Sequence, residues 1–216
     1  MNGIESYREL KPNIEIQKLV TSFSDALPAF PNSEEFSNVL KKKKNENQHT
    51  TALCLYMINF CNSTFIFMPQ NAQKGSSTID IGVYKGKNLI FVIEAKILPT
   101  PKGSNNQPRH EHEYVYGKGA GIQRFISGAH GVDNEDLPFS DSGMLAYVKE
   151  NDFVFWQNKV NQWILDFNRD SSEQLQKVSL DKTATFISAH ARQDGCSNLG
   201  RDGLGVDQDA VAVKDH

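Results

Sequence analysis

The stretch STIDIGVYKGKNLIFVIEAKI, residues 77–97, decides the fold of this 216-residue chain. β-branched and aromatic residues dominate its segments 78–84 and 89–97, as they do in β-strands. Between them, Lys-Gly-Lys-Asn at 85–88 supplies the residues of a tight turn. The stretch therefore predicts a β-hairpin, folded about Gly86.

Three ionisable side chains share one face of this hairpin. Residues whose numbers sum to about 174 lie opposite one another, which places Asp80 beside Glu94. Glu94 and Lys96 point to the same side because side chains alternate along a strand. Two neighbouring carboxylates repel each other unless a cation compensates them, and a divalent metal ion near Lys96 would do so. The alternative is an ordinary Glu-Lys pair on a surface hairpin.

The spacing of these residues resembles the signature of the PD-(D/E)xK nuclease superfamily, the restriction-endonuclease-like fold. Asp80 is followed, after thirteen residues, by Glu94-Ala95-Lys96, and the resemblance covers residues 34–148. Ile79 stands where the family has proline, which leaves the metal-binding residues intact. The resemblance implies an α/β fold, with a mixed central sheet flanked by helices, and a magnesium-dependent endonuclease that acts on DNA.

The resemblance also implies roles for individual residues. Asp80, Glu94 and the backbone carbonyl of Ala95 would hold one or two Mg²⁺ ions, with Mn²⁺ as the alternative ion. Lys96 would orient the attacking water or help to deprotonate it, which its pKa would permit if it fell near a metal. Glu46 lies on the helical continuation of a buried stripe and would lend a further carboxylate to the metal; exposure to solvent is its alternative.

A glycine-rich run at 117–121, GKGAG, precedes a helix predicted over 122–129. The run matches neither a Walker loop nor a dinucleotide-binding fingerprint, so nucleotide binding is disfavoured. Its amides are placed where a helix N-terminus can meet a phosphate. The resemblance implies that this helix packs near the active site, where Gln123 would assist. We expect Lys118 and Arg124 to contact the nucleic-acid backbone, with plain surface exposure as the alternative for each of the three residues.

Composition narrows the remaining possibilities. The chain is 38% hydrophobic and 23% charged, as folded domains are, and it has no apolar run of membrane-spanning length and no secretory signal, so we expect a cytoplasmic protein. Residues 71–130 hold eight basic against four acidic side chains, which suits a phosphodiester substrate. The His-Glu-His-Glu run at 110–113 has no second ligand pair at zinc-site spacing, which favours polar surface there.

The rest of the chain predicts a single domain over residues 1–192 and a disordered tail over 193–216. The three cysteines, without a CxxC pair, are expected to be reduced. The predicted flanking elements are helices over 14–27, 34–62 (capped by Asn32 or Ser33) and 151–168 (capped by Asn151), and strands over 63–69, 143–149 and 183–191.

The favoured function is metal-dependent hydrolysis of DNA, with RNA left open as a substrate and a homodimer left open as the assembly. The main alternative is a non-catalytic nucleic-acid-binding or interaction module on the same fold. A metal-dependent hydrolase of another substrate is a third. The complete set of Asp80, Glu94 and Lys96 favours the enzyme.

Overall fold

The structure is a computed structural model that describes most of the chain between residues 14 and 170. The described ranges are 14–40, 45–73, 78–102, 109–117, 121–128, 130–133, 135, 137–139 and 141–170, together with the backbone of strands at 179–180, 186–187 and 210–214.

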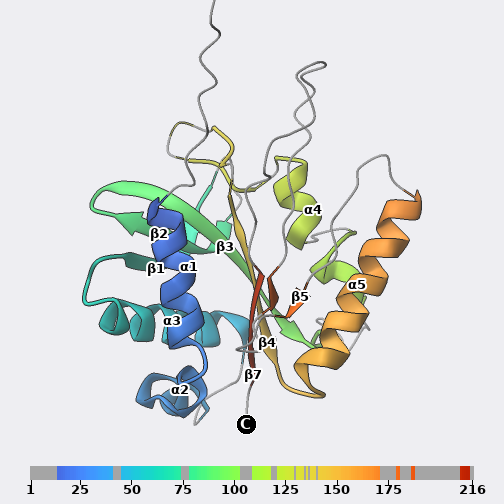
Figure 1. Ribbon diagram of the computed structural model, residues 1–216, viewed down its shortest axis with the longest axis horizontal. Coiled ribbons are helices and arrows are strands. Elements are labelled where there is room, and N and C mark those ends of the chain that lie inside the picture. The colour runs from blue at the N-terminus through green and yellow to red at the C-terminus, as the bar shows by residue number, and fades with distance from the viewer. Residues whose placement is uncertain are drawn as a thin grey trace, which may run out of the picture.

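A mixed sheet lies between two layers of helices (Figure 1). Its strands stand in the order β1-β2-β3-β4-β7, with the first three antiparallel and the last two parallel to β3. The prediction of an α/β fold with a mixed central sheet flanked by helices is therefore confirmed. The bounds are β1 Ile66–Ala72, β2 Thr78–Lys85, β3 Asn88–Leu98, β4 Gly143–Val148 and β7 Ala210–Lys214.

The hairpin register is the one that the sequence predicts. Ile81 pairs with Ile93 and Gly82 with Val92, so the paired numbers sum to 174. An irregularity between Val83 and Tyr84 then shifts the register by one residue before the turn. The turn residue Gly86 has a φ of 60°, a conformation that glycine adopts without strain.

One layer consists of α1 (Ile14–Ala26), α2 (Glu34–Leu40) and α3 (Glu46–Phe60) with a short 3₁₀ turn, Phe30–Asn32. The prediction of one long helix over 34–62 is wrong, because two N-caps are present. The Ser33 hydroxyl accepts a hydrogen bond from the amide of Phe36 at 3.1 Å, and the Asn45 side chain accepts one from Gln48 at 2.9 Å. The buried face of this layer packs on β1 to β4 through Leu19, Phe23, Leu53, Met57, Phe67, Ile93 and Leu145.

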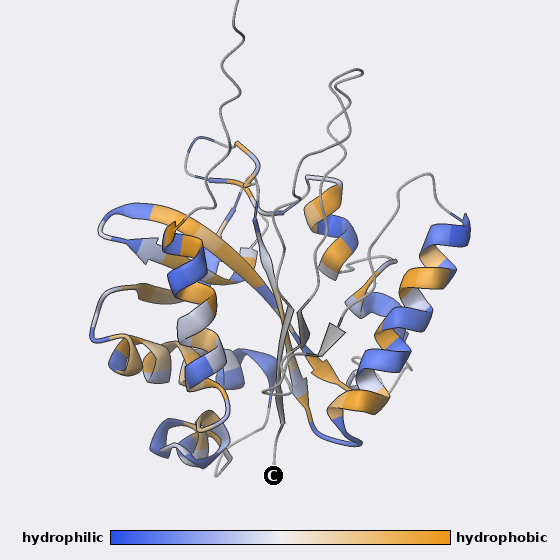
Figure 2. Cartoon of the chain, in the orientation of Figure 1, coloured by the Kyte–Doolittle hydropathy of each residue, from blue (hydrophilic) through white to orange (hydrophobic). Residues whose placement is uncertain are grey.

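The opposite layer contains α4 (Gly121–Ile126), α5 (Phe153–Asp170) and the 3₁₀ turn Glu111–Tyr114. The aromatic stripe of α5 packs on the sheet, and apolar bands alternate with hydrophilic ones along this helix (Figure 2). The stripe residues Trp156, Val160, Trp163, Ile164 and Phe167 are buried with Leu98, Met144, Ala146 and Val148 of the sheet.

The N-cap of α5 is Asp152 rather than the predicted Asn151. The Asp152 carboxylate accepts a hydrogen bond from the amide of Phe155 at 2.7 Å. Asn151 instead has a φ of 64°, so it forms the left-handed turn that precedes the helix. The helix begins one residue later than an Asn151 cap would give.

We expect Asp152→Ala to lower the free energy of unfolding by about 1 kcal/mol, because it removes this cap. Asn151→Gly is the matched control, since glycine adopts a positive φ freely and should leave stability unchanged or raise it. Urea denaturation of the two variants measures both. A larger loss of stability in Asn151→Gly than in Asp152→Ala would show that Asn151, and not Asp152, caps the helix.

The C-terminal part is described only as backbone strands. Within the predicted strand 183–191, Phe186–Ile187 (β6) pairs with Ser179–Leu180 (β5). Most of the predicted disordered tail lies outside the described residues, as does Cys196, but Ala210–Lys214 pairs in parallel with β4 and differs from that expectation. The run AVAV at 210–213 is the short apolar segment that accounts for this strand.

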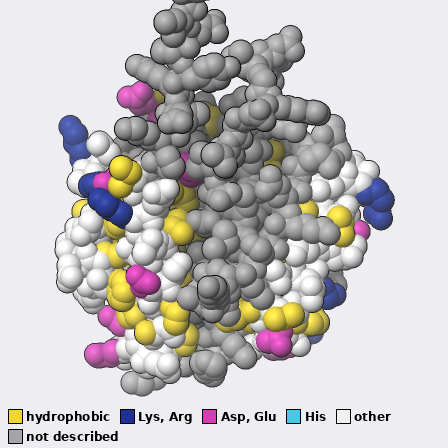
Figure 3. All heavy atoms as spheres, viewed as in Figure 1, with side chains coloured by type: hydrophobic (Ala, Val, Ile, Leu, Met, Phe, Trp, Pro, Cys, Tyr) yellow, Lys and Arg dark blue, Asp and Glu magenta, His cyan; other side chains and the backbone are white. Residues whose placement is uncertain are grey.

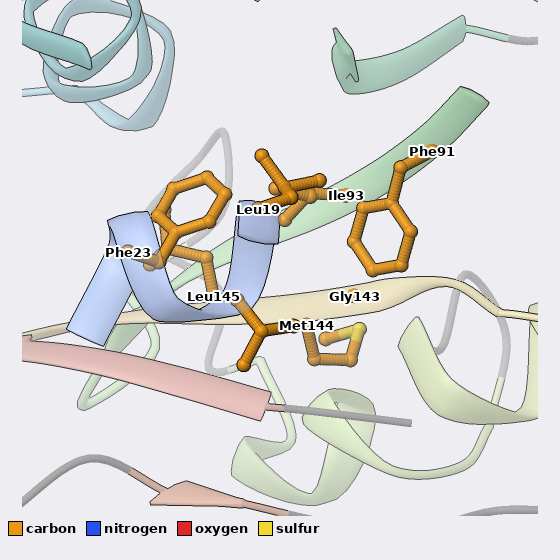
Figure 4. Close-up of a pocket in the computed structure, with 8 residues that line it drawn as sticks. Leu19, Phe23, Phe91, Ile93, Gly143, Met144 and Leu145 are labelled. Atoms are coloured by element: carbon orange, nitrogen blue, oxygen red, sulfur yellow. The ribbon is translucent and has the colours of Figure 1, made fainter. Parts of the chain in front are cut away.

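A small apolar pocket lies between α1 and strands β3 and β4 (Figure 4). Its volume of about 20 Å³ holds about one water molecule. Phe91 and Ile93 line it, so it lies across the sheet from the side chains of Glu94 and Lys96.

Among the described helices, none is long and apolar enough to cross a membrane. Cys54 and Cys61 are free thiols.

Candidate active site

The candidate site lies where β2 diverges from β3. The last residue pair of the hairpin is Ile81 with Ile93, and Asp80 is the next residue outward on β2. There the Asp80 carboxylate accepts a hydrogen bond from the backbone amide of Ala95 at 2.7 Å. The Asp80 side chain thus accepts the hydrogen bond of a β3 amide that lies beyond the last residue pair of the hairpin. This bond fixes the carboxylate against β3.

Lys96 is the centre of the cluster. Its Nζ lies 2.6 Å from Glu94 Oε1 and donates a hydrogen bond to the carbonyl of Ala95 at 3.0 Å. Glu46 Oε1 is 4.0 Å away on the other side. The side chains of Lys96 and Glu94 are only 11% and 5% exposed, so this ion pair is shielded from solvent.

Glu46 is the first residue of α3, and its side chain reaches the sheet. Its Oε2 accepts a hydrogen bond from the backbone amide of Ile97 at 3.2 Å. The structure therefore brings Glu46 to the same cluster as Lys96, from a helix about fifty residues away in the sequence. The Asn45 cap, which starts α3 at this point, positions it.

The pKa values follow from burial and from this crowding of charge. Burial, and then the charge of Glu94, raise the pKa of Asp80 to about 6. Burial also raises the pKa of Glu46, against the opposing charge of Lys96. Burial alone would lower the pKa of Lys96, but the neighbouring carboxylates, Glu94 first, outweigh it and raise that pKa. Without a metal ion Lys96 is therefore a cation, and the expectation that its pKa falls beside a metal stays a prediction.

Arg124 and His130 approach Glu94 from the segment around α4. Arg124 Nη1 lies 3.5 Å from Glu94 Oε1, and His130 Nδ1 lies 3.9 Å from Glu94 Oε2. The sequence predicts a phosphate contact for Arg124, and it does not single out His130. A lone histidine between Ala129 and Gly131 belongs to no motif, and only the fold shows that it faces a carboxylate.

Gln123 is engaged elsewhere. Its side-chain Oε1 accepts a hydrogen bond from the backbone amide of Gly117 at 3.0 Å. The backbone amide of Gln123 donates a second hydrogen bond to the carbonyl of Val115 at 2.9 Å. These bonds hold the chain that leads to α4. The catalytic role predicted for Gln123 has no contact to support it in the described part of the molecule, and Lys118 lies outside that part.

The run at 110–113 contributes to a stack of rings. His110 lies over His112 with ring centres 4.9 Å apart, and His112 lies over Tyr116 at 4.5 Å. Arg109 pairs with Glu113 at 2.8 Å. Within the described ranges, no three His, Cys, Asp or Glu side chains meet closely enough to hold a metal on their own.

The cluster around Lys96 nevertheless suits a cation. The Lys96 ammonium stands between the Glu94 carboxylate and the Ala95 carbonyl, so this position already takes a positive charge. Both groups are hard oxygen donors of the kind that Mg²⁺ and Mn²⁺ prefer, and water or substrate phosphate completes the shell of such ions. The predicted ligands are thus chemically compatible with the ion, provided that Lys96 moves aside.

Figure 3 shows charged side chains of both signs among the described residues on one face of the molecule. Basic and acidic side chains are scattered near its margins, and hydrophobic side chains lie among them.

No protein-family model, curated protein or solved structure matches this chain.

Asp80→Asn should stabilise the metal-free protein at neutral pH. The pKa of Asp80 is about 6 in the folded state against 3.8 as reference, so the folded state binds the proton more tightly. The free energy of unfolding therefore falls as pH rises from about 4 to 6, and the loss is complete above pH 6. The asparagine side chain does not ionise and therefore avoids this loss. We expect the free energy of unfolding of Asp80→Asn to exceed that of the wild type by about 1–3 kcal/mol at pH 7.5, since a shift of one pKa unit corresponds to about 1.4 kcal/mol.

Denaturation in EDTA at pH 4 and pH 7.5 measures the effect. The difference between Asp80→Asn and the wild type should shrink to near zero at pH 4. Asp25→Asn, on the exposed side of α1, is the matched control and should leave the free energy of unfolding at pH 7.5 close to that of the wild type. A destabilised Asp80→Asn at pH 7.5 would show that attraction to Lys96 outweighs burial.

Proposed function

We propose that this protein is a metal-dependent nuclease with a restriction-endonuclease-like core, which hydrolyses phosphodiester bonds in DNA. The observation that carries the proposal is the convergence of Asp80, Glu94, the Ala95 carbonyl and Lys96 where β2 and β3 diverge. These groups come from the two strands of the hairpin, in the positions that the resemblance to the superfamily implies.

The topology supports the same proposal. Three antiparallel strands are followed by a connection that contains α4 and leads to β4, parallel to β3. The mixed sheet with helices on both faces is the architecture that the resemblance implies. The carboxylates lie just beyond the last residue pair of the hairpin, where β2 stops pairing with β3.

Asp80, Glu94 and the Ala95 carbonyl would hold the metal ion, with Glu46 as a further carboxylate. A bound Mg²⁺ or Mn²⁺ would polarise a phosphoryl oxygen and lower the pKa of a coordinated water molecule. The protein positions these oxygens with its backbone: the Ala95 amide fixes Asp80, and the Ile97 amide fixes Glu46. Oxygen ligands held in this way need little rearrangement before substrate arrives.

Lys96 would act as a charged donor. As a buried cation it can hydrogen-bond a phosphoryl oxygen or the attacking water, and offset the negative charge that develops on the phosphate. Glu46, which lies 4.0 Å from the Lys96 ammonium, is the carboxylate to which we assign proton acceptance from that water when it does not bind the metal. Arg124, which is partly exposed beside Glu94, would contact a second phosphate oxygen.

Incubation of the purified protein with plasmid, linear and single-stranded DNA tests the proposal. We expect nicks or breaks in Mg²⁺ or Mn²⁺ and none in EDTA. RNA in the same assay shows whether the 2′-hydroxyl is tolerated. If no nucleic acid is cut with any divalent ion, the nuclease proposal fails and the alternative of a binding module on this fold takes its place.

A further inference from the structure

We propose that His130 and Glu94 form a nitrogen-containing metal position, which gives the site a preference for first-row transition ions over Mg²⁺. This inference deepens the proposed function and rests on it for the role of Glu94. It adds a ligand that neither the hairpin spacing nor the resemblance supplies.

His130 is a buried polar side chain without a satisfying partner. The residue is 2% exposed, and neither ring nitrogen has a hydrogen-bond partner in the described structure. An unsatisfied buried polar group costs about 1–3 kcal/mol, so such a group calls for a bound ion, water or substrate. The imidazole is therefore positioned for a ligand that the described residues do not provide.

Glu94 divides its two oxygens between different neighbours. Oε1 receives Lys96 at 2.6 Å and Arg124 at 3.5 Å, whereas Oε2 faces His130 Nδ1 at 3.9 Å. This gap is too long for a hydrogen bond. It suits one ion between the two atoms, because ligands that lie about 2.0–2.2 Å from a single metal are at most about 4.4 Å apart.

The loop that carries His130 is held firmly. The His130 amide donates to the carbonyl of Arg124 at 3.1 Å, and Gly131 accepts from Phe139 at 2.8 Å. Gly131 has a φ of 77°, and an added Cβ there would lie 2.9 Å from both Phe125 and Ser142. These contacts fix the backbone position from which the imidazole reaches Glu94.

The chemistry of the pair sets the metal class. Neither ring nitrogen of His130 has a hydrogen-bond partner among the described residues, so the imidazole can offer a nitrogen to an ion. Imidazole nitrogen favours transition ions, whereas Mg²⁺ prefers oxygen ligands and water. A position with one nitrogen and one carboxylate oxygen would therefore bind Mn²⁺ or a later first-row ion more tightly than Mg²⁺.

Pulsed electron paramagnetic resonance of Mn²⁺ added to the full chain tests this directly. We expect nitrogen modulation from a bound imidazole, which changes from the ¹⁴N to the ¹⁵N pattern when only histidine is labelled with ¹⁵N. His130→Phe keeps a ring of similar size without nitrogen, and it should lose the modulation and weaken Mn²⁺ binding at least about 10-fold, with Mg²⁺ binding little changed. His110→Gln, on the exposed ring stack, is the control and should change neither.

Several outcomes would overturn the inference: no Mn²⁺ binding, bound Mn²⁺ without histidine nitrogen, or modulation that survives His130→Phe. The labelled wild type gives an answer even if the variant does not fold. Failure of the proposed function looks different: histidine-bound Mn²⁺ in a protein that cuts no nucleic acid would keep the metal position and reject the nuclease. Cleavage by a protein whose Mn²⁺ has no nitrogen ligand would keep the nuclease and reject the His130 metal position.

Discussion

Lys96→Met should reduce metal-dependent DNA cleavage by about 10²–10³-fold, the loss typical of removing one donor aimed at developing charge. Lys96 is the cation closest to Glu94, and the surrounding carboxylates hold it protonated. Methionine keeps much of the length and apolar volume of lysine but cannot donate to a phosphoryl oxygen. DNA affinity should change little, because one lysine among several basic groups contributes little to binding.

Metal binding distinguishes loss of this donor from loss of the site. The Lys96 ammonium stands at the Glu94 and Ala95 oxygens that the ion would use, so lysine and metal compete for them. Calorimetric titration should therefore show that Lys96→Met binds Mn²⁺ at least as tightly as the wild type. Lys87→Met, in the exposed hairpin turn, is the matched control and should cut DNA normally. Wild-type cleavage by Lys96→Met would remove the lysine from the mechanism.

The hairpin could be predicted from the sequence because its determinants are local. Strand propensity, a turn with Gly86 and the alternation of side chains fix the register, and this register brings Asp80 to β3 beside the Glu94-Ala95-Lys96 run. The Asn45 cap was also readable: Asn45 followed three residues later by Gln48 matches the pattern of a capping box. The long-helix prediction gave more weight to apolar spacing than to this local signal.

The contacts made by α4 could not be read in the same way. Arg124 and His130 reach Glu94 only because α4 and the following loop pack against β3, which is a property of the tertiary fold. Gln123 is next to Arg124 in the sequence, yet it bonds to Gly117 instead. Adjacent helix residues point about 100° apart, so a helix placed without its rotation cannot assign the residue that faces the site.

Glu94→Gln should lose both cleavage and metal binding, in contrast to Lys96→Met. Glu94 is the residue on which Lys96, Arg124 and His130 converge, and its carboxylate is the ligand common to both proposed metal positions. Glutamine is nearly the same size as glutamate but carries no charge, so Lys96 and Arg124 lose their nearest counter-ion. We expect cleavage to fall by at least about 10³-fold and Mn²⁺ affinity by at least about 10-fold.

Calorimetry and the cleavage assay on the same preparations separate the explanations. Glu34→Gln, an exposed carboxylate in the first turn of α2, is the matched control and should behave as the wild type. Circular dichroism must show a folded Glu94→Gln protein, because the unpaired Lys96 also threatens stability. If the folded variant bound Mn²⁺ as tightly as the wild type, Glu94 would not be a ligand. The role of the cluster would then be to hold Lys96 and Arg124 in place by charge alone.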